Sequence, residues 1–349
     1  MHFASDNTAP VPPQVLEALI AANHGPAMPY GAEAAMATLT DRLRAVFEAP
    51  EAAVYLLATG TAANALSLAC LCPPWGAVFC HAHAHVEEDE CGAPEFFTGG
   101  AKLTLIGGAD GKITPGALEA ALAQGGHGVH NVQKGALSLT NTTEAGTVYS
   151  PDETAALCAM ARAHGLPVHL DGARFANAVA ATGASPAALT WQAGVDVLCL
   201  GGTKNGLLGA EAVVLFNPEK AWEFELRRKR AGHLLCKHRY LSAQFAAYLA
   251  DDLWLKLAAR ANAAAARLAE GIARLPGAHL VHPPQANAVF AAFPREAHRR
   301  AHEAGAQYYL WPGHQSLEGP AAEPLSARLV CAWSTSDDEV DRFLALLGG

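Results

Sequence analysis

The chain contains 349 residues, of which 51% are hydrophobic and 16% are charged, and its formal net charge is −9. This composition is typical of a well-packed globular protein and excludes a disordered chain, and the length favours one large and one smaller domain. Nucleic acid is not expected as a partner, because the chain is acidic and its densest basic run, Arg227-Arg228-Lys229-Arg230, is short.

The eight cysteines lie mostly in apolar runs, such as the one around Cys199. Buried free thiols in a reducing compartment account for this pattern better than disulfides, which belong to short secreted chains. The N-terminus lacks the basic and apolar regions of a signal peptide, and no stretch approaches the roughly 20 apolar residues of a membrane span. We therefore expect a cytoplasmic protein without a membrane partner.

Short apolar runs alternate with longer helical patterns from about residue 50 to residue 216. This alternation predicts an α/β fold whose sheet is mainly parallel and carries helices on both faces. The expected strands are Ala52–Leu57, Ala77–Cys80, Lys102–Ile106, Ala136–Leu139, Pro167–Leu170, Val195–Leu200 and Ala212–Phe216. The expected helices between them include Ala63–Leu71, Pro115–Leu122 and Asp152–His164.

The pattern changes after Asn217. Residues 218–271 are rich in alanine and predict helices, and the last part of the chain adds two short strands, Ala288–Ala292 and Arg328–Ala332. This arrangement predicts a small α+β domain that packs on the large one. We expect the N-terminal segment and large domain to span residues 1–245, and the small C-terminal domain to span residues 246–349.

Several expected strands end in an abrupt cluster of polar residues or glycine. In open α/β sheets ligands bind outside the carboxyl ends of the strands, so we expect these clusters to form a single site. They are Thr59-Gly60-Thr61, the segment from His81 to His85, Thr140-Asn141-Thr142, Asp171-Gly172-Ala173-Arg174 and Gly201-Gly202-Thr203-Lys204.

The first cluster, with Gly60 and Thr61, is a strand-to-helix turn whose small residues leave backbone N–H groups free for a phosphate. An ordinary tight turn is the alternative interpretation. The turn lacks the lysine of a P-loop and the GxGxxG of a dinucleotide site, so a nucleoside phosphate is disfavoured.

Asp171 and Lys204 follow two consecutive expected strands. Asp171 could cap a helix over Phe175–Ala180 or pair with a buried cation. Lys204 could be a surface lysine, or a buried amine able to form a Schiff base, and the glycines before it favour close approach of a flat ligand. Together they indicate pyridoxal 5'-phosphate, because the pyridine nitrogen of that cofactor needs a carboxylate partner.

Several motifs resemble those of low-specificity L-threonine aldolases, which belong to the β-eliminating-lyase branch of fold-type I pyridoxal-phosphate enzymes. The chain is most similar to the phenylserine-aldolase branch in residues 89–97 and 228–233. The motifs that carry the broader resemblance are Ser5-Asp6-Asn7-Thr8, Tyr30-Gly31, residues 58–64, His85, residues 169–174 and residues 202–206.

The resemblance implies a PLP-dependent aldolase that cleaves L-threonine, L-allo-threonine or phenylserine to glycine and an aldehyde. It implies a homodimer or homotetramer with shared active sites and a role for each of nine residues. Around the cofactor, Lys204 would bind it, Asp171 would pair with its ring nitrogen, Gly60 and Thr61 would hold its phosphate, and His85 would stack on its ring. Arg174 would contact the ring hydroxyl or the substrate, and Ser5 and Arg328 would anchor the substrate carboxylate. Tyr30 would reach in from a neighbouring subunit.

One position departs from the family pattern. Thr143 stands where many threonine aldolases have a second active-site histidine, with one apparent extra residue before Gly146. The base of the reaction is therefore open. His85, acting through a water molecule, is our first hypothesis, and His130 and His233 are the others.

Two further interpretations remain at this point. His81, His83 and His85 alternate, so a strand would place them on one face as a metal site requires, although we assign no metal ligand. A β-eliminating lyase or an aminotransferase would use the same Lys204 and Asp171, and a non-catalytic ligand-binding protein is the remote alternative.

Overall fold

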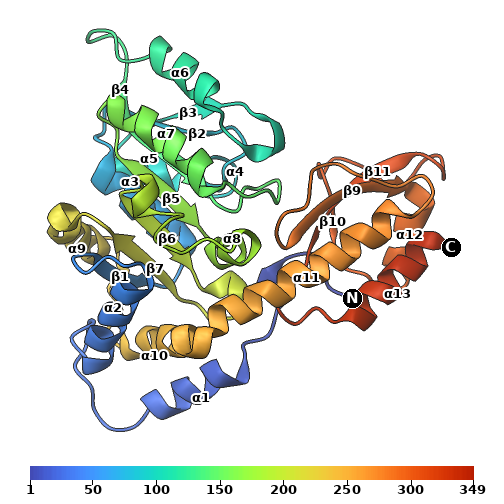
Figure 1. The fold of residues 1–349 in the computed structure, drawn as a ribbon, viewed down its shortest axis with the longest axis horizontal. Coiled ribbons are helices and arrows are strands. Elements are labelled where there is room, and N and C mark those ends of the chain that lie inside the picture. Colours follow the sequence, from blue (N-terminus) through green and yellow to red (C-terminus); the bar gives the residue numbers. More distant parts are fainter.

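The computed structural model describes residues 1–349, and its large domain is built on a seven-stranded sheet (Figure 1). All seven expected strands are present, and they are parallel except for β7, which runs antiparallel to both of its neighbours, β1 and β6. The prediction of a mainly parallel sheet is confirmed. The strands are β1 (Ala53–Leu57), β2 (Gly76–His81), β3 (Lys102–Ile106), β4 (Gln133–Thr140), β5 (Val168–Gly172), β6 (Val197–Gly201) and β7 (Glu211–Leu215), in the order β1-β7-β6-β5-β4-β2-β3.

Helices connect these strands and cover the sheet. Ser150 is the N-cap of α7 and forms a full capping box with Glu153. The Ser150 side chain accepts from the N–H of Glu153, and the Glu153 carboxylate accepts from the N–H of Ser150. The helices of this domain are α1 (Pro13–Ala22), α2 (Ala34–Val46), α3 (Gly60–Leu71), α4 (His85–Glu88), α5 (Ala93–Thr98), α6 (Pro115–Gln124), α7 (Pro151–Ala163), α8 (Phe175–Thr182), α9 (Ala221–Arg230) and α10 (Arg239–Leu249).

The C-terminal part of the chain forms a second, four-stranded sheet with helices on one side, as expected. The two predicted strands are β9 and β11, which pair antiparallel at its centre. The elements are β8 (His279–Leu280), β9 (Ala288–Pro294), α12 (Arg295–Glu303), β10 (Tyr309–Leu310), β11 (Pro324–Val330) and α13 (Asp337–Gly348). The sheet order is β10-β11-β9-β8.

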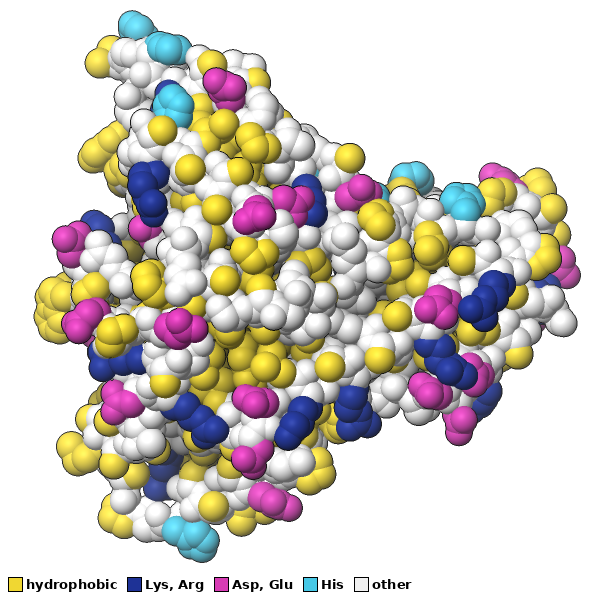
Figure 2. Space-filling view, in the orientation of Figure 1, with side chains coloured by type: hydrophobic (Ala, Val, Ile, Leu, Met, Phe, Trp, Pro, Cys, Tyr) yellow, Lys and Arg dark blue, Asp and Glu magenta, His cyan; other side chains and the backbone are white.

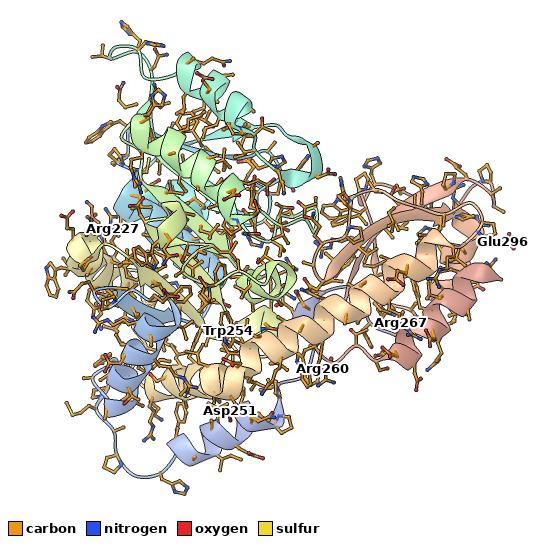
Figure 3. All side chains as sticks on the ribbon, in the orientation of Figure 1. Arg227, Asp251, Trp254, Arg260, Arg267 and Glu296 are labelled. Carbon is orange, nitrogen blue, oxygen red and sulfur yellow. The ribbon has the colours of Figure 1, made fainter.

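A single long helix, α11 (Leu253–Ala273), joins the two domains (Figure 3). Its first turns place Trp254 and Leu257 in the core of the large domain. Its later turns place Leu268 and Ile272 in the core of the small domain, where Phe3 of the N-terminal segment also lies. The expected boundary between residues 245 and 246 stays a prediction.

On the face that Figure 2 shows, basic and acidic side chains are interspersed, and no extended region carries one charge. All eight cysteines are free and six of them are buried, as the apolar runs predicted. None of the helices has the length and the apolar character that crossing a membrane requires.

The end of β6 lies against the chain that follows β5. An added Cβ at Gly201 would overlap the backbone carbonyl of Ala173, which cannot swing away as a flexible side chain would. A glycine is therefore required here so that the loops carrying Asp171 and Lys204 can approach each other.

We expect Gly201→Ala to lower the free energy of unfolding by at least about 1–3 kcal/mol, because the methyl group forces the two loops apart. Gly116→Ala is the matched control. A Cβ at Gly116 meets no atom within 4 Å, so that change should alter stability by less than about 1 kcal/mol. Urea unfolding of both variants measures this, and equal stabilities would contradict the expectation.

Candidate active site

The carboxyl ends of the parallel strands meet at one edge of the large sheet. Asp171 lies at the end of β5, and Lys204 follows β6 in a short 3-10 turn (Thr203–Asn205). That turn packs against a second 3-10 turn, Asp6–Thr8, from the N-terminal segment. The strand ends and the N-terminal segment thus meet at the same place.

Asp171 is buried and does not cap a helix. Its Oδ1 accepts from the N–H of Ala173 at 2.9 Å, and its Oδ2 accepts from the Asn64 side chain at 2.9 Å. The N-cap of α8 is Arg174, which makes no side-chain capping bond. Of the two interpretations of Asp171, the helix cap is therefore wrong.

His85 begins α4 and is held by Glu90. The ring Nδ1 lies 2.9 Å from Glu90 Oε1, and the side chain of Glu90 is fully buried. The same Oε1 accepts from the Asn64 side chain at 2.8 Å. The hydrogen bond to Glu90 raises the pKa of His85 above its ordinary value, although burial acts in the opposite direction.

Lys204 lies close to several acids at this edge. Its charge favours the ionised forms of Asp6 and Glu211 and disfavours the protonated form of His85, although other causes are larger in each case. Glu211 begins β7, and its Oε2 accepts from the N–H of Gly202 at 3.0 Å, which fixes the turn before Lys204. Burial raises the pKa of Glu211 to about 7.

Arg174 is bound by Asp6 through two of its three nitrogens. Its Nε and Nη2 donate to the two oxygens of Asp6 at 2.7 and 3.0 Å, and Asn287 donates to the same carboxylate at 3.1 Å. Burial of the two groups opposes their charges, but the pair holds the pKa of Asp6 below its ordinary value and that of Arg174 above it. Asp6 was not assigned a role from the sequence, although it lies in the Ser5–Thr8 motif.

Arg328 lies in β11 of the small domain and faces the same place. Its Nη2 donates to the carbonyl of Ala4, next to Ser5, at 3.4 Å, and its Nε is buried without a partner. Its guanidinium lies over the rings of Tyr309 and Trp311. A half-buried guanidinium with a buried, unused donor is suited to a carboxylate ligand.

The turn before α3 keeps backbone donors free. The first bonds of the helix come from the N–H of Ala62 to Thr59 Oγ1 and from the N–H of Ala63 to the Thr59 carbonyl. The N–H groups of Gly60 and Thr61 therefore have no acceptor in the helix. A Cβ at Gly60 would meet no atom within 4 Å, so space for a ligand is open beside it.

The segment after β4 departs from expectation. Thr143 is buried, and its Oγ1 bonds to Thr147 Oγ1 at 2.7 Å and to the carbonyl of Asp110, so it closes a turn. Glu144, the next residue, acts on the pKa values of His85, Arg174 and Arg328 through its charge. In the sequence, only the apparent extra residue before Gly146 indicated that Glu144 would lie near the site.

Three histidines considered from the sequence do not converge. Strand β2 ends at His81, whose Nε2 bonds to the carbonyl of Gly108. Beyond the strand, His83 pairs with Glu88 at 2.7 Å and His85 pairs with Glu90. The alternation therefore does not place them on one face. His85, Glu90 and Asp171 do bring ligand atoms within 4.8 Å of one another, but the Asn64 amide donates to both carboxylates.

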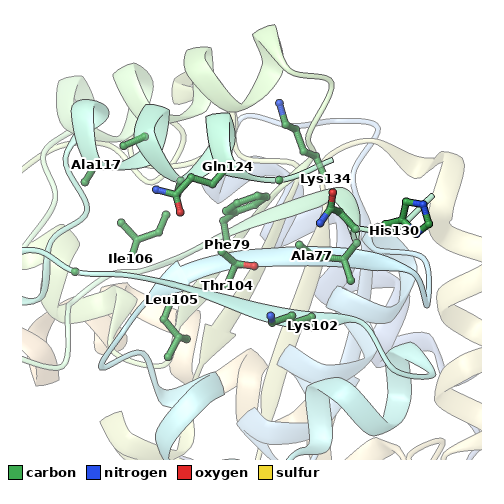
Figure 4. A pocket seen from close by; sticks show the side chains of 16 residues that line it. Ala77, Phe79, Lys102, Thr104, Leu105, Ile106, Ala117, Gln124, His130 and Lys134 are labelled. Carbon is green, nitrogen blue, oxygen red and sulfur yellow. The ribbon is translucent and has the colours of Figure 1, made fainter. Parts of the chain in front are cut away.

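His130, one hypothesis for the base, is placed elsewhere. It precedes β4 and so lies at the amino end of the strand, in a cavity of about 640 Å³ between the sheet and α6 (Figure 4). That hypothesis is wrong. His233 lies just after α9, where its N–H donates to the carbonyl of Arg228.

Tyr30 is also outside the set around Lys204. Its hydroxyl accepts from Cys236, Lys229 lies 4.9 Å from its ring centroid, and the side chain is exposed. Beside Tyr30 lies a surface hollow of about 400 Å³, which is also lined by Arg228 and His238.

This sheet topology, with a small α+β domain beside the carboxyl edge, defines the fold-type I class of pyridoxal-phosphate enzymes. A structure of Sphingomonas wittichii serine palmitoyltransferase matches it with a TM-score of 0.69 and 16% identity, covering 100% of this chain and 86% of that one. This similarity concerns the fold alone.

The chain belongs to the beta-eliminating lyase family, whose model matches residues 2–295. It is 43% identical to the low specificity L-threonine aldolase of Pseudomonas aeruginosa over 97% of this chain and 94% of that protein. It is 41% identical to the enzyme of the same name from a Pseudomonas species over 99% and 96%. A structure of Leishmania major threonine aldolase matches with a TM-score of 0.90 and 26% identity, covering 99% and 98%. The resemblance to low-specificity threonine aldolases is confirmed.

Strand β5, which carries Asp171, also contains the fully buried His169. The effect of this histidine on the free energy of unfolding can be measured. His169 bonds to Ser138 and Cys199, and burial lowers its pKa to about 4. In the unfolded chain the pKa is about 6.5. The unfolded state therefore binds more protons below that pH, and stability falls as the pH drops from about 6.5 to 4.

We expect His169→Gln to make this loss smaller by up to about 3 kcal/mol, in urea unfolding at a series of pH values. His127→Gln, at an exposed position, should keep the slope of the unchanged protein. An equal slope in both variants would show that His169 is accessible to protons in the folded state.

Proposed function

We propose that this protein is a PLP-dependent aldolase that cleaves β-hydroxy-α-amino acids, including L-threonine, L-allo-threonine and phenylserine, to glycine and an aldehyde. The names of its relatives support threonine as a substrate. The observation that carries the proposal is Arg328, a half-buried arginine whose Nε is buried without a partner and which faces the charged groups around Lys204. It fits the carboxylate that every amino acid presents.

The residues at the edge of the sheet fit the cofactor. Lys204 would bind it covalently, Asp171 would face its ring nitrogen, and the free N–H groups of Gly60 and Thr61 would hold its phosphate. Asp171 is suited to that task because Asn64 and Ala173 already fix its orientation while oxygen lone pairs remain. When bound, the cofactor supplies a sink for the electron pair of the broken Cα–Cβ bond.

The protein contributes binding and orientation. Arg328, with Ser5 beside it, would hold the substrate carboxylate, and this fixes which bond at Cα stands perpendicular to the ring of the cofactor. The ring of His85 would lie over the cofactor. Arg174 is held by Asp6. We therefore propose that this pair forms a fixed polar surface near the ring hydroxyl of the cofactor.

We further propose that the active form is a homodimer or homotetramer. Tyr30 lies away from Lys204 in its own chain, against Cys236 and Lys229, and it is exposed at the edge of a hollow that contains buried Arg228. A second copy that docks on this face would receive Tyr30 in its own site.

We expect the protein to form glycine and acetaldehyde from L-threonine and to show visible absorption from the bound cofactor. Lys204→Ala should lose that absorption, and its rate of glycine formation should fall by at least about 10³-fold. Lys256→Ala, at an exposed position on α11, is the control. A 2-oxo acid in place of glycine would contradict aldol cleavage and favour elimination or amino transfer.

Arg328→Lys should raise KM for L-threonine and lower kcat/KM by about 10- to 100-fold, because lysine keeps the charge but loses the paired donors. Arg267→Lys, an exposed change on α11, should have no effect. Steady-state kinetics measure both. An unchanged KM in Arg328→Lys would remove this residue from the carboxylate site.

A further inference from the structure

A buried hydrogen-bonded chain connects His85 to Asp171. Glu90 Oε1 accepts from His85 and from the Asn64 side chain, and the same Asn64 nitrogen donates to Asp171. Both hydrogens of that amide are thus used, one for each carboxylate. These hydrogen bonds fix the distance between Asp171, which is expected to face the cofactor, and Glu90, which lies behind His85.

The backbone is strained directly after Glu90. His85 begins α4, and the chain then turns at Cys91 and Gly92, which have φ values of 52° and 72°. Positive φ is unfavourable for a cysteine. A strained turn directly after Glu90 is consistent with a residue whose position matters more than the local conformational energy.

Glu90 fixes the tautomer of His85. An ionised carboxylate has no proton to donate, so Nδ1 of the ring must carry the hydrogen that joins the two groups. In the neutral ring Nε2 is then the nitrogen that can accept a proton. A nearby pair gives a contrast, because His83 and Glu88 are joined at 2.7 Å at the surface, where solvent weakens the interaction.

We propose that Glu90 is the positioning residue for the base of the reaction, holding His85 so that its Nε2 receives the β-hydroxyl proton of the substrate. This inference rests on the proposed aldol cleavage. The proton moves from the hydroxyl oxygen to Nε2, the O–H electron pair forms the carbonyl bond of the aldehyde, and the Cα–Cβ pair stays on the glycine fragment. The imidazolium that results is stabilised by the Glu90 carboxylate.

The charged groups that face His85 set the pH dependence. Glu90, Asp171 and Glu144 raise its pKa, and Lys204 lowers it. Replacing Glu90 by glutamine keeps an oxygen that can accept from Nδ1 but removes its charge, so the pKa of His85 should fall. Because the base must be unprotonated, the acidic limb of the kcat/KM profile should then move to lower pH.

The test compares Glu90→Gln with Glu88→Gln in the holoenzyme. We expect Glu90→Gln to shift the acidic limb down by about one pH unit and to lower kcat by about 10- to 100-fold, because the imidazolium loses its charged partner. KM should change little, and Glu88→Gln should match the unchanged enzyme. Glu90→Asp, which keeps the charge, should return the limb toward its original position. An unshifted profile in Glu90→Gln would overturn the proposal.

A second measurement does not depend on the folding of any variant at Glu90. In the holoenzyme with ¹⁵N-labelled histidine, the ring nitrogens of His85, assigned by their loss in His85→Asn, should show Nδ1 protonated and Nε2 free at the pH optimum. Protonated Nε2 with bare Nδ1 would overturn the proposal. Glycine formation by the unchanged enzyme is scored separately, so failure of the proposed function is recognised as such.

Discussion

The ion pair between Asp6 and Arg174 is the interaction on which the site depends. Removing a guanidinium from water costs several kcal/mol unless a carboxylate receives it with good geometry, and Arg174 is placed at the end of β5, inside the protein. Asp6 comes from the N-terminal segment, and Asn287, just before β9, bonds to the same carboxylate. One buried charge therefore fixes three distant parts of the chain, and Arg328 of the small domain is brought beside them.

Asn64 has a comparable role on the other side of the site. Two buried carboxylates that share no donor would repel each other at close range. The side chain of Asn64 removes this difficulty because it offers two hydrogens from one nitrogen. The helix that carries Asn64 also begins at the turn with Gly60 and Thr61. A single helix, α3, thus sets both the proposed phosphate contacts and the spacing of the acids.

The sheet was predictable from the sequence because most of its strands, such as β2, β5 and β6, are buried on both faces and read as continuous apolar runs. The meeting of Asp171 with the turn of Lys204 followed from the common direction of β5 and β6. The remaining contacts depend on tertiary structure. Asp6 and Arg174 are far apart in sequence, and so are Asn64 and Asp171, so no local pattern indicated these contacts. The hypothesis for His130 was wrong because a histidine before a strand lies at the opposite edge from one after it.

The continuity of α11 has a consequence for unfolding. Its first turns complete one core and its last turns complete the other, and between them Asn262 bonds twice to Asn177 of α8. The small domain cannot lose this helix without exposing apolar surface of the large domain as well. The two cores are therefore thermodynamically coupled, and the chain is expected to lose its structure in one cooperative transition.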